Sequence, residues 1–264
     1  MNKWTVDKIK NAKGREKIVC LTAYDYSTAR IIDQAGIHLI LVGDSLAMTM
    51  LGYETTLPVT MDEMLHHTKA VTRGVKNALV VADMPFMSYQ VSVSQAIANA
   101  GRFVKEANAG AVKIEGGISR TNTIKALLDQ GIPVLGHIGL TPQSINQFGG
   151  FKIQGKIPQE AARLMKDASA LAEAGVFAVV LECVPADLAA DITASCSVPT
   201  IGIGAGPGCD GQILVTHDML GIHSKVSPKF VKRYADLDGA MQTAFENYAA
   251  DVKNGVFPSL EHSY

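Results

Sequence analysis

Short, continuously apolar segments recur along this chain, and each delivers a charged or imidazole side chain near its end. Residues 39–43 lead into Asp44, and residues 78–82 lead into Asp83. Segments of four to six residues rich in valine, isoleucine and leucine are too short for helices and are typical of parallel strands buried on both faces. A charge inside such a strand is costly unless it is paired or bound to a metal. Further segments deliver Lys113, Glu115, His137 and Glu182.

Eight expected strands alternate with segments of helical length. The strands are expected at residues 17–23, 39–44, 79–83, 112–115, 133–137, 178–182, 199–203 and 212–216. Beyond a short N-terminal helix, mixed apolar and polar spacing predicts helices at residues 27–35, 61–74, 94–109, 121–130, 159–174 and 187–195. This alternation predicts a parallel sheet with right-handed crossovers.

The number of strands and the length of the chain together favour one fold class. A single (β/α)8 barrel takes about 250 residues, and this chain has 264, of which 47% are hydrophobic. Seven or eight strands favour a closed barrel over the alternative, an open doubly wound sheet, and no GxGxxG fingerprint follows the first strand. We predict one α/β domain over residues 1–264, a (β/α)8 TIM barrel with an extra C-terminal helical segment after Asp218. Active sites of such barrels lie at the C-terminal ends of the strands.

Composition argues against several classes of partner. Lys and Arg number 24 against 25 Asp and Glu, without the basic excess that binds nucleic acids or anionic membranes. The N-terminus lacks the apolar core of a secretory signal, and prolines and glycines in the uncharged stretch 192–209 exclude a spanning helix there. The four cysteines are scattered and form no disulfide framework. We expect a cytoplasmic protein that binds small molecules, with no nucleic acid and no membrane as partner.

Asp44 and Asp83 end neighbouring strands and predict a metal site. Two carboxylates at adjacent strand ends can share one Mg²⁺, which keeps positions open for water or substrate. A 2-oxo acid can chelate such an ion through its carboxylate and ketone oxygens. The alternative is that each aspartate caps the helix that follows it. Because Glu115 is expected close by, the metal site is the favoured interpretation.

Lys113 and Glu115 lie two positions apart, so in a strand their side chains face the same side. If that side is the barrel interior, Lys113 can hold a substrate carboxylate and Glu115 can reach the metal directly or through water. The alternative is a buried ion pair that closes on itself and binds no ligand.

Glu182 and His137 are the remaining catalytic candidates. A carboxylate at an apolar mouth has its charged form disfavoured, which suits Glu182 to the role of general base. A salt bridge to a neighbouring strand is its alternative role. His137 can donate a hydrogen bond, transfer protons or bind metal, although a histidine in such a strand is more often a core residue. Cys183 has no adjacent base, so core packing is a better interpretation than a nucleophile.

Two connections are candidate binding loops. Residues 140–158 form a long segment after the fifth strand, and loops of this length are often lids or binding loops. Residues 202–206, Gly-Ile-Gly-Ala-Gly, resemble the glycine-rich loops with which barrels bind phosphate, although tight packing alone could require these glycines.

These groups suit the removal of a proton beside a carbonyl, followed by formation of a carbon–carbon bond. A metal ion stabilises the enolate oxygen as charge develops there, and a carboxylate base takes the proton. Phosphoryl transfer fits less well, because the chain has neither a P-loop nor a kinase signature.

Collinear motifs along essentially the whole chain resemble those of a known family. They are TAYD (22–25), VGDSL (42–46), TLPVT (56–60), DMPFM (83–87), VKIEGG (112–117), GHIGLTPQ (136–143), LECVP (181–185), IGIGAG (201–206), DGQILV (210–215) and EHSY (261–264). Together they resemble ketopantoate hydroxymethyltransferase. One position departs: Ala47 stands where family members often have glycine, and its methyl group could narrow the substrate loop or shift its backbone.

The resemblance implies a Mg²⁺-dependent enzyme of pantothenate biosynthesis, related to the phosphoenolpyruvate/pyruvate barrels. Such an enzyme transfers a hydroxymethyl group from 5,10-methylenetetrahydrofolate to 3-methyl-2-oxobutanoate, giving 2-dehydropantoate and tetrahydrofolate. The family also implies a homodecamer of two pentameric rings. The alternative is a metal-dependent 2-oxo acid lyase or mutase of the same superfamily, which would turn over without folate.

The resemblance also implies roles for individual residues. Asp44 and Asp83 are implied to bind the metal, and Glu115 to complete its environment. Glu182 is implied to accept the proton from C3 of the substrate. Ser45 and Lys113 are implied to hold the substrate carboxylate. The full set of residues implied to bind the substrate is Asp44, Ser45, Asp83, Lys113 and His137.

Overall fold

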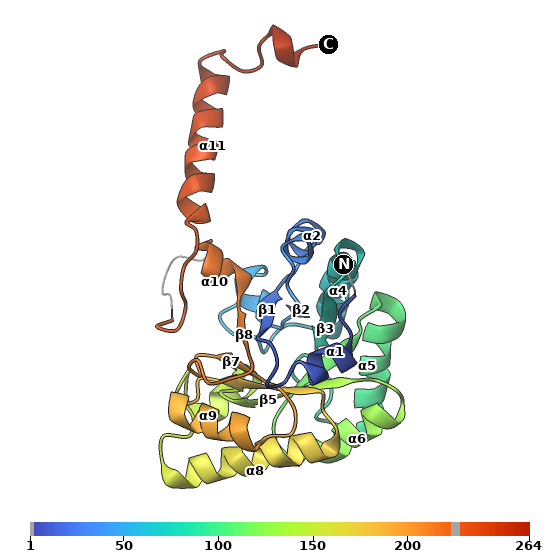
Figure 1. The fold of residues 1–264 in the computed structure, drawn as a ribbon. Coiled ribbons are helices and arrows are strands. Elements are labelled where there is room, and N and C mark those ends of the chain that lie inside the picture. Colours follow the sequence, from blue (N-terminus) through green and yellow to red (C-terminus); the bar gives the residue numbers. More distant parts are fainter. Residues whose placement is uncertain (1–2, 223–227) are drawn as a thin grey trace. The chain divides into compact units, whose positions relative to one another are not determined.

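The computed structural model describes residues 3–222 and 228–264 of the chain. It contains two compact units, Met1–Val215 and Thr216–Tyr264. Within the described part of the first unit, parallel strands close into a barrel in the order β1 to β8, and β8 pairs back to β1 (Figure 1). The predicted (β/α)8 barrel is therefore confirmed.

The strands lie where the apolar segments predict them. β3 and β6 match the expected ranges residue for residue, and the other strands differ by one or two residues at an end. Their bounds are β1 (Ile18–Thr22), β2 (Leu39–Val42), β3 (Leu79–Asp83), β4 (Ala111–Glu115), β5 (Val134–Gly139), β6 (Ala178–Glu182), β7 (Thr200–Ile203) and β8 (Gly211–Leu214).

The helices of the first unit begin and end at recognisable signals. Thr60 and Glu63 form a reciprocal capping box at the start of α4, and Ser92 caps α5. Gly175 ends α8 with a φ of 101°, a conformation that favours glycine. The helices are α1 (Val6–Asn11), α2 (Tyr26–Gln34), α3 (Leu46–Thr49), α4 (Met61–Gly74), α5 (Val93–Ala107), α6 (Thr121–Asp129), α7 (Ile145–Phe148), α8 (Pro158–Ala174) and α9 (Ala186–Ser195), with 3₁₀ turns η1 (Ile118–Arg120) and η2 (Pro142–Ser144).

Side chains on the strands alternate between two hydrophobic clusters. On β3, Leu79 and Val81 belong to the cluster inside the barrel, whereas Val80 and Ala82 pack in the layer between strands and helices. Because side chains on a strand alternate with a period of two, Asp83 continues the interior row. The same alternation puts four further polar side chains on interior rows: Lys113, Glu115, His137 and Glu182.

The second unit contains the predicted C-terminal helical segment. Its elements are α10 (Thr216–Leu220), α11 (Leu237–Lys253) and a final 3₁₀ turn, η3 (Leu260–His262). None of the residues of α11 is buried. Across residues 3–222 and 228–264, no helix combines the length and the apolar character needed to cross a membrane.

Candidate active site

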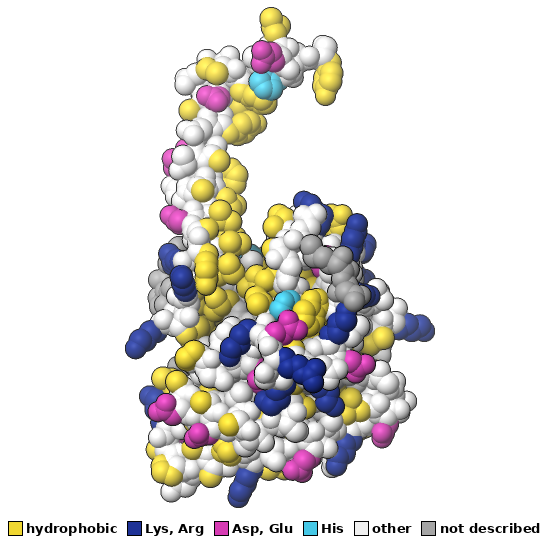
Figure 2. All heavy atoms as spheres, in the orientation of Figure 1, with side chains coloured by type: hydrophobic (Ala, Val, Ile, Leu, Met, Phe, Trp, Pro, Cys, Tyr) yellow, Lys and Arg dark blue, Asp and Glu magenta, His cyan; other side chains and the backbone are white. Residues whose placement is uncertain are grey.

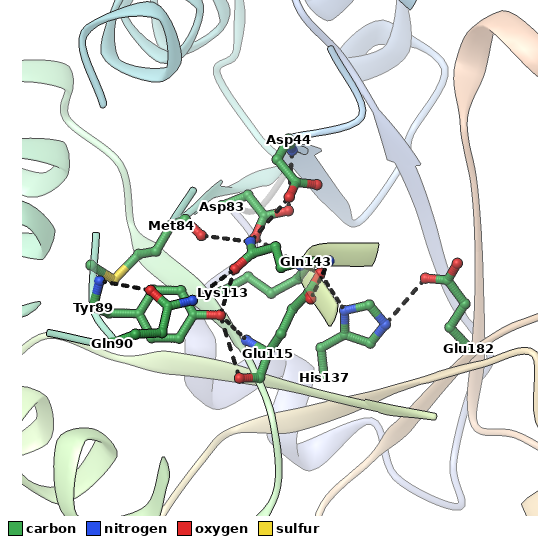
Figure 3. A network of polar contacts seen from close by, with 10 residues as sticks. All are labelled: Asp44, Asp83, Met84, Tyr89, Gln90, Lys113, Glu115, His137, Gln143 and Glu182. Carbon is green, nitrogen blue, oxygen red and sulfur yellow. Dashed lines mark hydrogen bonds and ion pairs between the residues drawn. The ribbon is translucent and has the colours of Figure 1, made fainter. Parts of the chain in front are cut away.

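The interior rows of neighbouring strands end in one cluster of polar side chains (Figure 3). The register pairs Asp83 with Lys113 and Glu115 with His137 across adjacent strands. Burial is nearly complete, because Asp83 is 1% exposed and Lys113 and Glu115 are each 4% exposed. The structure thus brings together the polar residues that the sequence analysis selected at these strand ends, with Asp44 following β2.

Lys113 is shared among the acids of this cluster. Its Nζ lies 2.7 Å from Asp83 Oδ1 and 3.6 Å from Glu115 Oε1. Burial lowers the pKa of Lys113, but the carboxylates of Asp83, Glu115 and Asp44 outweigh burial and leave the pKa above its usual value. The ion pair is therefore not a closed Lys113–Glu115 pair, since the shorter contact goes to Asp83.

Asp44 lies two residues beyond the end of β2 and contacts Asp83 through its backbone. Its N–H donates a hydrogen bond to Asp83 Oδ2 at 3.2 Å, and its own Oδ2 accepts one from Gln143 Nε2 at 3.0 Å. Burial, followed by repulsion from Asp83 and Glu115, raises the pKa of Asp44 well above its usual value. Burial also raises the pKa of Asp83, against the opposing effect of Lys113.

The helix-cap alternative for the two aspartates is wrong. Thr60 and Ser92 supply the caps of α4 and α5, and Ser45 occupies the N-cap position of α3 without a side-chain cap hydrogen bond. The oxygens of Asp44 and Asp83 instead accept hydrogen bonds from other members of the cluster.

His137 lies between two carboxylates. Its Nε2 is 3.1 Å from Glu182 Oε2, and its Nδ1 is 3.5 Å from Glu115 Oε1. Burial and Lys113 lower the pKa of His137, but the two carboxylates outweigh them and raise it to about 9. Burial also raises the pKa of Glu115, yet Lys113 and His137 outweigh it and leave that pKa below its usual value. The Glu182 side chain, 17% exposed, is the most accessible acid of the group.

The donor set fits a hard divalent cation held by few protein ligands. Within the described residues, no group of three or more His, Cys, Asp or Glu side chains is arranged to surround a metal. Mg²⁺ commonly binds only one or two carboxylates and completes its shell with water or substrate. Asp44 and Asp83 supply such a pair, and Glu115 Oε1 is a buried carboxylate oxygen without a hydrogen-bond donor in the described chain.

Two residues of the cluster were missed by the sequence analysis. Gln143 lies in η2, inside the loop 140–158, and its side chain contacts Asp44. Tyr89 donates its hydroxyl to Gln143 Oε1 at 2.7 Å and accepts the backbone N–H of Glu115 at 3.2 Å. The motif GHIGLTPQ contained a signal for Gln143, whereas nothing around Tyr89 marked it as part of the cluster.

Ser45 and Ala47 lie next to the acids at the start of α3. Ser45 Oγ is 2.8 Å from the Tyr24 hydroxyl, which fixes its position. Ala47 is fully buried inside the helix, and its φ is not positive. The alanine therefore causes no left-handed backbone strain in this segment.

Two further sequence candidates are the glycine-rich loop 202–206 and Cys183. At Gly206, with a φ of 75°, an added Cβ would lie 2.5 Å from Ala186 Cβ, so close packing requires this glycine. Burial, with a contribution from Glu182, raises the pKa of Cys183 to about 12. A thiol that is so hard to ionise is a poor nucleophile. Cys183 is only partly buried and lies outside both hydrophobic clusters, so the predicted core position is not observed.

Comparison with known proteins identifies the family. The model of the ketopantoate hydroxymethyltransferase family matches residues 3–260. The chain belongs to the ketopantoate hydroxymethyltransferase family. The 3-methyl-2-oxobutanoate hydroxymethyltransferase of Syntrophus aciditrophicus (strain SB) is 58% identical over 263 residues, which cover 99% of this chain and 97% of that protein. The protein of the same name from Enterococcus faecalis is 61% identical over 94% of this chain and 90% of its own.

Solved structures of low identity share the fold of this family member. A phosphonopyruvate hydrolase, solved in complex with oxalate and Mg++, has a TM-score of 0.62 at 14% identity, covering 98% of this chain and 93% of its own. The family predicted from the motifs is thus confirmed, and so is the barrel architecture.

Proposed function

We propose that this chain transfers a hydroxymethyl group from 5,10-methylenetetrahydrofolate to 3-methyl-2-oxobutanoate, giving 2-dehydropantoate and tetrahydrofolate. The observation that carries the proposal is one partly exposed acid, Glu182, held beside a buried group of three carboxylates and a lysine. Family membership over residues 3–260 supports the choice of substrates. In the balanced reaction, C3 of the keto acid loses a proton and bonds to the one-carbon unit, whose two carbon–nitrogen bonds to the folate break. Water supplies the hydroxyl group, and the proton from C3 and the remaining proton of water end on the two folate nitrogens.

Glu182 is the proposed proton acceptor at C3. Its carboxylate is the accessible one, and His137 Nε2 holds it at 3.1 Å. With a pKa raised to about 9, the His137 imidazole stays protonated near neutral pH and can donate a hydrogen bond to the Glu182 carboxylate.

The carboxylates on β3 and after β2 are the proposed holders of Mg²⁺. Asp44 and Asp83 would bind it, with Glu115 beside them. A divalent cation supplies Lewis acidity, which polarises the keto group of a bound substrate and makes its C3 proton more acidic. Lys113 and Ser45 then remain as the groups that hold the substrate carboxylate, one by charge and the other by its hydroxyl.

We further propose that the protein is a homodecamer in the cytoplasm. Helix α11 supports an assembly, because Met241, Phe245, Tyr248 and Val252 follow one another at spacings of three and four and are all exposed. Hydrophobic side chains run along this helix in Figure 2. Such a face is typical of a helix that packs against another subunit.

The proposal is tested by following both half-reactions by NMR. With Mg²⁺, we expect exchange of the C3 proton of 3-methyl-2-oxobutanoate for deuterium without folate, and formation of 2-dehydropantoate when methylenetetrahydrofolate is added. EDTA should abolish both, and Glu182→Gln should lower both by at least about 100-fold while the protein stays folded. Near-normal exchange in Glu182→Gln would overturn the assignment of the base. Cleavage of the keto acid without folate would indicate a lyase instead.

A further inference from the structure

Gln143 contacts two of the buried acids through two different parts of the residue. Its side-chain Nε2 donates to Asp44 Oδ2 at 3.0 Å, and its backbone N–H donates to Glu115 Oε2 at 3.0 Å. The Asp44 and Glu115 carboxylates are therefore both hydrogen-bonded to Gln143, and the distance between them depends on the position of this residue. Gln143 is 5% exposed, so water does not compete for these contacts.

The orientation of the Gln143 amide is fully determined by its neighbours (Figure 3). The Nε2 group faces two acceptors, Asp44 Oδ2 and the carbonyl oxygen of Met84 at 2.9 Å. Oε1 faces two donors, the Tyr89 hydroxyl at 2.7 Å and Gln90 Nε2 at 3.2 Å. A flipped amide would put its oxygen against two acceptors and its nitrogen against a donor amide, so only the observed orientation satisfies all four contacts.

A neutral amide is suited to this position. Lys113 and the protonated His137 already place two positive charges beside the acids, and a further cationic donor at position 143 would weaken the attraction for a divalent ion. The amide of Gln143 orients Asp44 by hydrogen bonding and adds no net charge. In metal sites, groups that hydrogen-bond to a ligating carboxylate fix its direction in this way.

The loop that carries Gln143 is hydrogen-bonded at two points to the backbone at the end of β6. At its start, the N–H of Leu140 donates to the carbonyl oxygen of Glu182 at 2.8 Å. Further along, the N–H of Gln154 donates to the carbonyl oxygen of Cys183 at 2.9 Å. The backbone around Glu182 therefore holds the loop, and the loop holds the acids on the opposite side of the cluster.

We propose that Gln143 is a positioning residue, which Tyr89 holds in one orientation, and that it sets the direction and spacing of the Asp44 and Glu115 carboxylates for binding of the divalent cation. The proposal rests on the function proposed above, because it takes these acids as the holders of the metal. It adds a role for the loop 140–158, which delivers a residue that orients the acids.

The test compares Gln143→Met with the parent protein and with a matched control, Gln147→Met. Methionine keeps the length of the side chain and removes its hydrogen bonds, and Gln147 is an exposed residue of the same loop. Binding of Mn²⁺ alone is measured by electron paramagnetic resonance, and C3 deuterium exchange is measured at saturating Mn²⁺. We expect Gln143→Met to weaken Mn²⁺ binding and to slow exchange by about 10–100-fold each, with Gln147→Met unchanged in both.

Tyr89→Phe keeps the proposal testable if Gln143→Met fails to fold. Removing this one hydroxyl leaves the Gln143 amide in place but less firmly oriented, so Mn²⁺ binding should weaken by about threefold to tenfold. A residue with a merely structural role would lower the melting temperature and leave the Mn²⁺ affinity of the folded protein unchanged. Parent-like Mn²⁺ affinity in a folded Gln143→Met or Tyr89→Phe variant overturns the proposal. Absence of exchange in the parent protein overturns the proposed function instead.

Discussion

Buried acids lie at both ends of this barrel, and their surroundings differ. At the N-terminal end of the strands, Asp33 is 3% exposed and accepts four hydrogen bonds, from the backbone N–H groups of residues 76–78 and the side chain of Asn77. At the C-terminal end, Asp44 is 4% exposed and its side chain accepts one from Gln143, the only such bond within the described chain.

The two environments change the acidity of the same functional group in opposite directions. Burial raises the pKa of Asp33, but the hydrogen bonds from residues 76–78 outweigh it and bring the pKa below its usual value. Burial and two neighbouring carboxylates raise the pKa of Asp44 well above it. Folding surrounds Asp33 with hydrogen-bond donors, whereas it places Asp44 beside the carboxylates of Asp83 and Glu115. The partners of a buried acid, rather than its burial, thus distinguish a structural from a functional carboxylate.

The same substitution at the two ends should separate the two roles most clearly in activity. Asp44→Asn keeps an acceptor for Gln143 but removes a proposed metal ligand, and we expect kcat/KM to fall about 10³-fold, which corresponds to about 4 kcal/mol. Asp33→Asn should leave kcat/KM within about twofold of the parent at a temperature where both proteins are folded. Steady-state assays with 3-methyl-2-oxobutanoate measure both. Comparable losses in the two variants would contradict the assignment of different roles.

The sequence pointed to the acids proposed to bind the metal but not to the buried acid in α2. Asp44 and Asp83 each follow an apolar strand, so their positions at the C-terminal rim could be predicted from a local pattern. Asp33 lies within helix α2, and three of its four donors are backbone groups 43 to 45 residues away, which no side-chain pattern encodes. Gln143 was missed for a similar reason, because its contact with Asp44 spans 99 residues.

Fold prediction succeeded because strand and helix periods are local properties. The apolar segments defined all the strands of the barrel within one or two residues, and glycine and cap signals defined the helices between them. The network around Tyr89 and Gln143 depends instead on how loops from different strand ends meet. Neutral polar residues in loops are common, so their type alone does not mark a site.

The two substitutions should affect the free energy of unfolding in the opposite order, with Asp33→Asn causing the larger loss. Asp33→Asn places an NH₂ group against two of the four donors that now face the carboxylate, and leaving buried donors without partners costs about 1–3 kcal/mol each. We expect a loss of about 3 kcal/mol and a melting temperature lower by about 6–12 °C. Asp44→Asn relieves repulsion among carboxylates and should be neutral or stabilising by about 1 kcal/mol. Thermal unfolding in EDTA checks both, and a strongly destabilised Asp44→Asn would show that its charge is needed for folding.

The smallest expected effect concerns how the stability of the folded protein changes with pH. The contributions of Asp33 and Asp44 to this change should have opposite signs. Because the pKa of Asp33 is lowered on folding, its ionised form stabilises the native state above the usual carboxyl pKa of about 3.9, and this advantage disappears as the pH falls through the native value. Because the pKa of Asp44 is raised on folding, its ionised form destabilises the native state, and acidification through that raised value removes the penalty. Relative to each Asn variant, the parent should therefore lose stability on acidification in the Asp33 comparison and gain it in the Asp44 comparison. Melting curves from neutral pH to about pH 2 in EDTA would measure both differences, because the Asp33 effect develops only below the usual carboxyl pKa of about 3.9. Slopes of the same sign would mean that the two acids have similar partners in solution.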